Sequence, residues 1–573
     1  MNILILNMTR MGDLIQTTPI IHEAKKRNPR CHITLVVGEA FAEICSFIEG
    51  VDRVLPFPMG RIHRLLKDGE IVRGYALLRE VLDVINEREY DLLVNLTHSR
   101  VSAILMTLIR KRRVVGISID SEGNAVFLGQ WQRYFMNIVP NRLYNPFNIC
   151  DLHLFMAGFG PCGEGLFLRT PEEFEKRADK ILRSIGVDGR EKILGIHPGA
   201  STEKKRWGAE NFSFVAREAA KRGVRVVVFG SSGEKDLCER IVRDSGEGAI
   251  SLAGKTTLGE LVALIERCSL LLTNDTGPLH IATAVGTKAV EISLGEAYFR
   301  ETGPYGEGHY VFEASISCHP CPFREGCSHM TCRQFVRPEA VWKVVSSLLD
   351  GEEVERLEDG GPFENLQVYR SRFSPEDGVL EYMPLIRRPL EERQFLLFLY
   401  RDLFLSDLGG EWETPLEGDP SRPLRNLEGG YDLSTLPGIV ESLGEMCRRL
   451  TLLLGEAERG AALTKEVKKI ISAEEKAGDE RLEELLSELG SIDKSIINTG
   501  HAFPPLRPLT RYFQFEKISI DSDDPVIVAD RTREAYESFI RRGKAFLRYV
   551  EEAETWAERF RIEEPVPIKG MSE

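Results

Sequence analysis

The chain has 573 residues, of which 42% are hydrophobic and 28% are charged. This length exceeds what one hydrophobic core supports, so we expect two to four domains, and the composition is typical of a globular protein. The sequence has no apolar run near the roughly 18 residues that span a bilayer. It also begins without the basic and long apolar regions of a secretory signal peptide, so we expect a cytoplasmic protein.

The net charge of −14 is unevenly distributed along the sequence. Residues 1–350 carry about +2 and residues 351–573 about −16. The first part can therefore face an anionic substrate. The acidic second part argues against binding to nucleic acid.

Apolar runs of strand length alternate with helical patterns from the start of the chain. The predicted strands are 2–7, 32–38, 53–58, 91–97 and 112–118, and the helical stretches between them include 14–27, 63–88 and 99–110. Continuous apolar strands with helical crossovers indicate a parallel sheet that is covered on both faces. Residues 1–165 are therefore predicted to form one Rossmann-like domain.

A second series of strands begins after a helical stretch at 171–186. Its predicted strands are 192–199, 224–230, 249–254, 269–275 and 288–295, with helices near 208–222, 233–245, 257–266 and 277–286. Residues 171–350 are therefore predicted to form a second Rossmann-like domain. We expect the ligand crevice where the carboxyl ends of the two sheets face each other.

Beyond residue 350 the alternation of strands and helices stops. Long helical patterns at 434–456, 463–489 and 529–561 predict an appended, mainly helical region over 366–573, whose role the sequence leaves open. The most apolar segment, 394–408, is too short to span a bilayer. It is interpreted as the core helix of this region, with an interfacial or partner-binding helix as the alternative.

The first loop of interest reads "TRMGDLIQTTP". Asp13 follows the first strand and begins the next helix, where a carboxylate can be a helix cap or a catalytic group. Pro19 is predicted to kink that helix.

A second loop reads "TNDTGPLH", at the end of a buried strand. The N–H groups of Thr276 and Gly277, together with the positive end of the following helix, predict an anion site suited to a diphosphate. Asp275 precedes them, and His280 lies one turn into the helix. The alternative is an ordinary capped helix with a core histidine.

Two further loops follow buried strands of the second domain. In "HPGASTEKKRW", the hydroxyls of Ser201 and Thr202 and the cations around Lys205 predict a phosphate-binding loop, with a solvated lysine run as the alternative. In "FGSSGEK", Glu234 is placed to accept hydrogen bonds from ribose hydroxyls, or to complement the helix dipole.

These motifs, in this order and at these separations, resemble glycosyltransferase family 9, the heptosyltransferases of lipopolysaccharide core assembly. The resemblance covers residues 1–350. It implies a GT-B fold, with an acceptor-binding first domain and a donor-binding second domain. It also implies inverting transfer of a heptose from an ADP-linked donor to a glycolipid or oligosaccharide acceptor, without a cofactor for catalysis.

The resemblance also assigns roles to individual residues. Asp13 matches the general base, and Lys205 matches the lysine that holds the donor phosphate. The other donor-binding positions are Ser201, Thr202, Glu234, Asp275, Thr276, Gly277 and His280. Ala200 and Pro278 depart from the family pattern, which bears more on the identity of the sugar than on the reaction.

Two other functions stay open at this stage. A GT-B enzyme can use another nucleotide sugar or acceptor. A binding or scaffold protein can retain the fold and act through its helical tail.

The segment "CHPCPFREGCSHMTC" contains four clustered cysteines. Cys318, Cys321, Cys327 and Cys332, with His319 and His329 between them, form a candidate for structural zinc or an iron–sulfur cluster, and reduced thiols are the alternative.

Basic residues of the first domain suggest a peripheral contact with the inner face of the cytoplasmic membrane. Lys25, Lys26, Arg27 and the run 110–113 can face a phosphorylated glycolipid or anionic lipid, and solvated helix ends are the alternative.

Overall fold

The structure is a computed structural model that describes residues 1–187, 191–322, 326–411, 418–472 and 479–561. Its internal contacts divide the chain into two compact units. The first consists mainly of Met1–Gln132 and Phe147–Ile386, and the second of Arg133–Pro146, Arg387–Gly410 and Thr414–Glu573.

The first sheet of the first unit has the strand order β3-β2-β1-β4-β5-β6. Its strands are β1 Asn2–Asn7, β2 His32–Gly38, β3 Arg53–Phe57, β4 Tyr90–Asn95, β5 Lys111–Ile119 and β6 Ala125–Leu128. They are parallel except β6, which returns antiparallel to β5 after a turn that the Asp120 carboxylate holds by accepting from Glu122 and Asn124 N–H groups. This hairpin strand was not predicted, because its four residues are too short to give a periodic signal.

The helices of this first domain differ from the prediction in their boundaries. They are α1 Met11–Ile15, α2 Thr18–Arg27, α3 Met59–Lys67, α4 Ile71–Ile85, α5 Arg100–Leu108 and α7 Ile149–Ala157. The single helix predicted at 63–88 is two helices, because Gly69 takes a left-handed φ of 79° between them.

The helix predicted at 14–27 is likewise two helices, α1 and α2, and the prediction of a kink at Pro19 is wrong. Pro19 lies in the first turn of α2, after the N-cap residue Thr17. A proline in that turn leaves no intrahelical hydrogen bond unmade, so it begins a helix rather than bending one.

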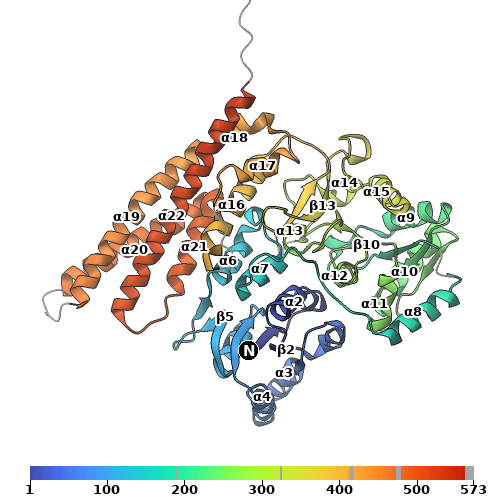
Figure 1. Ribbon diagram of the computed structural model, residues 1–573, viewed down its shortest axis with the longest axis horizontal. Helices are drawn as coiled ribbons and strands as arrows, with labels where there is room; N and C mark the ends of the chain where they lie inside the picture. Colours follow the sequence, from blue (N-terminus) through green and yellow to red (C-terminus); the bar gives the residue numbers. More distant parts are fainter. Residues whose placement is uncertain (188–190, 323–325, 412–417, 473–478, 562–573) are drawn as a thin grey trace, which may run out of the picture. The chain divides into compact units, whose positions relative to one another are not determined.

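The second sheet has the order β14-β13-β12-β11-β10-β7-β8-β9. The strands β7 Ile193–His197, β8 Arg225–Val228, β9 Ala249–Ser251, β10 Leu270–Asn274, β11 Ala289–Ser293 and β12 Tyr310–Ala314 are parallel. The helices α8 Glu172–Ser184, α9 Ala209–Lys221, α10 Lys235–Ser245, α11 Leu258–Glu266, α12 Gly277–Ala284, α13 Phe299–Thr302, α14 Thr331–Phe335 and α15 Pro338–Asp350 belong to this domain (Figure 1).

This sheet extends beyond the predicted end of the second domain. The strands β13 Leu366–Phe373 and β14 Leu380–Pro384 continue it as an antiparallel hairpin on β12. The prediction that the helical region starts at 366 is therefore wrong by about twenty residues. The hydrogen bonds that recruit β13 come from a strand more than fifty residues away, so local sequence gives no sign of them.

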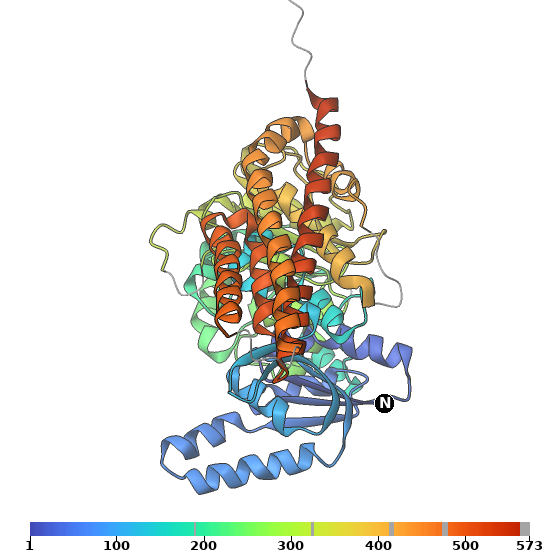
Figure 2. The same cartoon turned by 90° about the vertical axis from the view of Figure 1, so that its left-hand side faces the viewer.

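The second unit is built from helices. They are α16 Glu392–Leu408, α17 Arg422–Glu428, α18 Leu436–Ser442, α19 Gly444–Ser472, α20 Asp479–Ala502, α21 Arg507–Ile518 and α22 Pro525–Ala557. The long helices α19, α20 and α22 lie side by side in both views (Figures 1 and 2). Twelve residues of α16 are buried, so the prediction of a core helix at 394–408 is confirmed.

A segment from the first 165 residues also belongs to this helical unit. The ring of Tyr134 lies 4.8 Å from that of Phe404, and the Asn137 side chain donates a buried hydrogen bond of 2.8 Å to Pro508 O. The predicted first domain, 1–165, is therefore interrupted at 133–146. Its aromatic side chains complete a core whose other residues come from more than 250 positions later.

The prediction of two Rossmann-like domains and a mainly helical C-terminal region is confirmed by these sheets and helices. Within the described ranges, every helix is too short or too polar to cross a lipid bilayer.

Acidification is expected to destabilise the first unit. Burial lowers the pKa of His98 and His309 to about 3 and that of His153 to about 4. Below about pH 6.5 these histidines bind protons in the unfolded chain, whereas in the folded chain their imidazoles stay neutral. Stability therefore falls from pH 6.5 towards 4, by up to about 1.4 kcal/mol per histidine and pH unit.

Calorimetric melting between pH 7 and pH 5 measures this loss. His309→Gln can still accept from Ala289 N–H, the bond that His309 Nδ1 accepts at 3.1 Å, and should weaken the pH dependence. The exposed His63→Gln should leave it unchanged. Equal pH dependence in His309→Gln and the native protein would refute this account.

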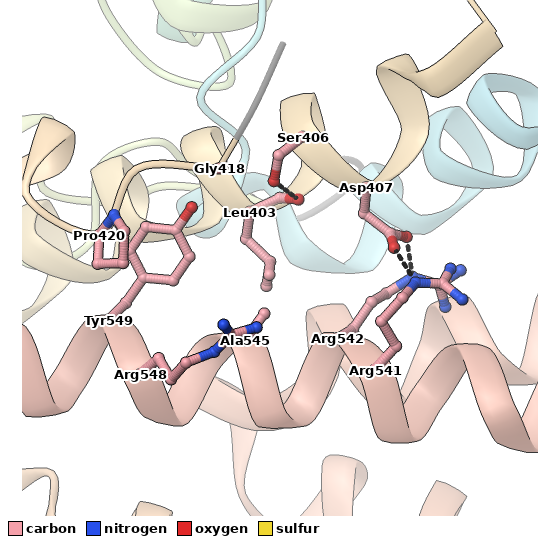
Figure 3. A pocket seen from close by; sticks show the side chains of 10 residues that line it. All are labelled: Leu403, Ser406, Asp407, Gly418, Pro420, Arg541, Arg542, Ala545, Arg548 and Tyr549. Carbon is pink, nitrogen blue, oxygen red and sulfur yellow. Dashed lines mark hydrogen bonds and ion pairs between the residues drawn. The ribbon is translucent and has the colours of Figure 1, made fainter. Parts of the chain in front are cut away.

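The helical unit should depend strongly on the buried Arg542. Its guanidinium contacts Asp407 at 2.5 Å and Glu516 at 2.7 Å, and only 2% of its side chain is exposed. Figure 3 shows Arg541 and Arg542 of α22 reaching Asp407 of α16, beside a pocket of about 340 Å³. Arg542→Met should cost about 3–5 kcal/mol, because it removes the ion-pair partner of Glu516 and leaves Asp407 with Arg541 alone.

Urea unfolding followed by helical circular dichroism tests this expectation. Arg531→Met, an exposed position on the same helix, is the matched control and should change stability little. Similar midpoints for the two variants would show that the Arg542 ion pairs do not hold the unit together.

Candidate active site

Four loops of the second domain meet at one edge of its sheet. They follow β7, β8, β10 and β11, four parallel strands whose carboxyl ends lie together. This edge is where open α/β sheets bind ligands. The predicted loops 198–207, 230–234 and 274–277 are all part of it.

Asn274 joins two of these loops, and the sequence prediction missed it. Its amide nitrogen donates to Pro198 O at 2.9 Å and to Gly199 O at 3.0 Å, and its Oδ1 accepts from Trp207 N–H at 3.2 Å. A fully buried amide that makes three hydrogen bonds fixes the turn after β10 against the loop after β7. A polar amide as the last residue of a buried strand was the available signal.

Lys205 and Asp275 form an ion pair across these two loops. Lys205 Nζ lies 2.5 Å from Asp275 Oδ2, and the two side chains are 14% and 11% exposed. The structure therefore brings together two predicted site residues that are seventy positions apart. A cation held this way at a helix start can neutralise an incoming phosphate.

Thr276 is the N-cap residue of α12, and its side chain reaches the last residue of β7. Its Oγ1 lies 3.3 Å from His197 Nδ1. Gly277 and Pro278 form the first turn of α12, as predicted. The N–H group of Gly277 is therefore one of the helix-start donors that are not used within the helix.

Glu234 caps a helical turn and also lies near the end of β7, at the same edge of the sheet. Its Oε2 accepts from Ser231 N–H at 2.8 Å and lies 3.9 Å from His197 Nε2. A Cβ atom at Gly199 would collide with this carboxylate and displace it from its present position. Burial raises the pKa of Glu234, but the Ser231 hydrogen bonds and His197 outweigh it, and the net pKa is lowered.

Thr202 and Lys204 are bound to Glu296, a second residue that the prediction missed. Thr202 Oγ1 donates to Glu296 Oε1 at 2.7 Å, and Lys204 Nζ lies 3.4 Å from Oε2. Ser201 is exposed on the same loop. The two neighbouring lysines therefore have different partners, and Lys205 is the one at the turn that begins α12.

A buried carboxyl lies beneath this edge, on β11. Glu291 is inaccessible to solvent, and burial together with the negative charge of Asp275 raises its pKa well above the usual range. Its protonated, uncharged form is therefore favoured. Asp275 remains the carboxylate that balances the charge of Lys205.

The loop after β1 lies directly against the start of α12. A Cβ atom built on Gly12 would lie 2.8 Å from His280 Cδ2, and Met11 Cε lies against Gly277. Gly12 is therefore required for close approach of α1 to α12. This contact brings the predicted acceptor-side loop to the predicted donor turn.

Asp13 has one carboxylate oxygen bound and the other available. Oδ2 accepts from Arg10 N–H at 3.0 Å, which caps α1, and the described residues offer no hydrogen bond to Oδ1. The side chain is half-buried. Asp13 is therefore both a helix cap and a positioned carboxylate.

His280 is a buried, neutral imidazole beside this contact. Burial lowers its pKa, although the charges of Asp275 and Asp13 act in the opposite direction. It is 5% exposed, and its Nδ1 makes no hydrogen bond to a described residue. The structure thus brings His280 to the same place as Asp275 and Asp13, as the sequence predicted.

The cysteine cluster does not form a metal site in the described residues. Nowhere in these ranges do three or more His, Cys, Asp or Glu side chains come close enough to hold a metal ion, although 323–325 of this loop lie outside them. His319 is buried against Glu313 at 3.2 Å, and His329 lies 2.8 Å from Thr331 Oγ1. The prediction of structural zinc or an iron–sulfur cluster is therefore not supported.

The four thiols of this cluster have different environments. Cys318 is exposed, Cys321 and Cys327 are partly buried, and Cys332 is buried. Burial raises the pKa of Cys321 and Cys332, whereas backbone N–H groups of Met330 and His329 lower that of Cys327. These properties fit reduced thiols.

Most of the basic residues predicted to face lipid have acidic partners. Lys25 pairs with Asp52 at 2.7 Å and Lys26 with Glu164 at 2.8 Å. Arg27 is ion-paired with Glu23, and Arg112 is ion-paired with both Glu89 and Asp91. Because acidic partners neutralise these cations, they attract anionic lipid only weakly. Contact with a membrane stays a prediction.

Residues 79–331 match the family described as glycosyltransferase family 9 (heptosyltransferase). The lipooligosaccharide heptosyltransferase 2 of Campylobacter jejuni is 34% identical over 177 residues, which cover 30% of this chain and 55% of that protein. The lipopolysaccharide heptosyltransferase 3 of Escherichia coli is 28% identical over 286 residues, 49% of this chain and 80% of that protein. The chain thus spans little more than half the length of the first of these relatives.

A solved structure of a family 9 glycosyltransferase from Veillonella parvula aligns with 61% of this chain and 98% of its own, with 23% identity and a TM-score of 0.49. The family match covers the loops that contain Lys205, Glu234 and Asp275, while Asp13 precedes it. Residues 79–331 are therefore similar to glycosyltransferase family 9.

Proposed function

We propose that this protein transfers a heptose from ADP-heptose to a lipopolysaccharide-core or related cell-envelope saccharide, with inversion and without a catalytic metal. The observation that carries the proposal is the contact of α1 with α12, at which Gly12 lies against His280. It joins a carboxylate on one domain to the turn on the other where Lys205 pairs with Asp275. The names of the relatives support heptose as the sugar.

Asp13 is the proposed general base. The acceptor hydroxyl attacks the anomeric carbon of the donor, the bond from that carbon to the diphosphate oxygen breaks, and the hydroxyl proton passes to Asp13. The free Oδ1 supports this role, because capping by Oδ2 holds the carboxylate without consuming both oxygens. Attack from the face opposite the leaving group gives inversion.

Lys205 and the start of α12 are proposed to hold the leaving diphosphate. Charge develops on that group as the glycosidic bond breaks, and a preorganised ammonium with helix-start N–H groups stabilises it. The Lys205–Asp275 ion pair supports this assignment, because it fixes the ammonium before the donor binds. Glu234, on the next loop of the same edge, is the proposed partner of the ribose hydroxyls.

A donor panel tests the substrate assignment. Nucleotide release from ADP-heptose should exceed that from UDP-, GDP- and dTDP-sugars by at least about a hundredfold, the discrimination that a few hydrogen bonds give. Faster turnover of another donor would favour a different GT-B transferase, which is the alternative within the same fold. The anomeric configuration of the product, measured by NMR, tests inversion.

Asp13→Asn should abolish turnover while leaving the donor bound. The amide oxygen still accepts from Arg10 N–H, so the cap of α1 is kept, but no base remains. We expect kcat to fall by about 10²–10⁴-fold, with the Kd for ADP changed less than about twofold. Asp68→Asn, an exposed carboxylate in the α3–α4 turn, is the control. Unchanged turnover in Asp13→Asn would reject Asp13 as the base. No turnover by the native protein, with a cellular function that Asp13→Asn leaves intact, would instead favour a scaffold that acts through its helical unit.

Lys205→Met should reduce catalysis far more than Lys204→Met. The two lysines are adjacent, but Lys205 pairs with Asp275 at the start of α12 whereas Lys204 faces Glu296. We expect a loss of about 10²–10³-fold in kcat for Lys205→Met, the size seen when one donor to a developing anion is removed. Melting temperatures should show that both variants are folded. An equal loss in kcat in the two variants would then reject Lys205 as the phosphate-holding residue.

A further inference from the structure

The hairpin formed by α3 and α4 exposes a group of large apolar side chains at its tip. Leu66 is 49% exposed, Ile71 66%, Val72 81% and Tyr75 63%. They belong to the last turn of α3 and the first turns of α4. Figure 2 shows these two helices, in blue, projecting side by side from the first sheet.

The base of the hairpin is well packed, so the exposure at the tip is not general looseness. Ile62, Leu77 and Leu78 contribute to the core of the first domain, together with Val81. Near the tip, a Cβ atom at Gly74 would lie 3.1 Å from Leu66 Cδ2, so α3 and α4 are in close contact there. The packed base of the hairpin therefore holds the apolar side chains of the tip away from the core.

The turn between the helices is also ordered. Leu65 O accepts from Glu70 N–H at 2.8 Å, and Arg73 Nη1 contacts Glu70 Oε2 at 2.5 Å. The first bond ties the start of α4 to the end of α3, and the ion pair lies within the start of α4. The positions of Ile71 and Val72 are fixed beside that turn.

The charge of α3 complements an anionic surface. This helix contains Arg61, Arg64 and Lys67 and has no acidic residue. The turn after it holds the exposed Asp68 and Glu70, and Glu70 is paired with Arg73, so cations outnumber carboxylates around the tip. Arg61 pairs with Glu39, while Arg64 and Lys67 are exposed and form no ion pair with a described residue. Apolar side chains flanked by such cations are the signature of segments that lie in the interface of a membrane.

We propose that the hairpin tip, defined as Leu66, Ile71, Val72 and Tyr75, inserts into the interfacial layer of a bilayer that contains anionic lipid. The four side chains leave water for the acyl boundary, with the Tyr75 hydroxyl at the level of the headgroups. Arg64 and Lys67 lie against lipid phosphates. Only the benefit to catalysis, holding the first domain near a lipid-linked acceptor, rests on the proposed function.

Vesicle flotation of the full-length protein tests this surface. Binding to phosphatidylcholine vesicles that contain phosphatidylglycerol should exceed binding to pure phosphatidylcholine by about fivefold for each engaged cation. The triple variant Ile71→Ser, Val72→Ser, Tyr75→Ser should bind at least about tenfold more weakly, because it removes most of the inserted area. All three positions are exposed, so folding should be preserved.

The matched control is Leu452→Ser with Leu486→Ser, which removes two exposed leucines of the helical unit. It should bind vesicles like the native protein, and Arg64→Gln with Lys67→Gln should lose the preference for anionic lipid. ADP release with a water-soluble acceptor should be the same in the triple variant. Failure of sugar transfer would leave the vesicle result intact, so the two proposals fail separately.

Three results would overturn the proposal. They are no binding of the native protein to anionic vesicles, equal binding by the triple variant, and a native dimer in light scattering that the triple variant converts to monomer. The last would assign the tip to a second copy of the chain.

Discussion

The hydrogen bonds of the buried Asn274 amide hold together the loops at the carboxyl ends of β7 and β10, where the sugar donor is proposed to bind. Parallel strands bring their carboxyl ends to one side of a sheet, but the loops that follow them are otherwise independent. Three hydrogen bonds from one side chain join the turn after β10 to the loop after β7. Because both loops are fixed, Lys205 and Asp275 meet at 2.5 Å and present a cation at the start of α12.

Close packing determines the junction of the two Rossmann-like domains. Gly12 and the imidazole of His280 are so close that a methyl group on Gly12 would not fit. The carboxylate of Asp13 follows directly and uses one oxygen to cap its own helix. A structural role and a chemical role are therefore compatible in one residue, since the cap orients the group that the proposed reaction uses.

The helical unit has a different physical basis. Its centre is apolar, as in α16, yet it also buries the guanidinium of Arg542 with two carboxylates. Such a cluster adds little net stability compared with apolar packing, but it penalises arrangements that separate its members. It therefore favours one packing of α16, α21 and α22 over its alternatives.

The sequence by itself determined five strands of each Rossmann-like domain, but not β6 or β12, and the segments that would carry Lys205, Glu234, Asp275 and His280. These follow from periodicity and from turn residues, which are local properties. Tertiary structure alone decided that Pro19 begins a helix, that β13 and β14 belong to the second sheet, and that 133–146 joins the helical unit. It also decided that Asn274 and Glu296 tie the donor loops together and that no metal group forms from the cysteines of the described chain. Except at Pro19, where the helix start is local, the deciding partner lies far away in the sequence, and only folding brings it within the few ångströms over which hydrogen bonds and packing act.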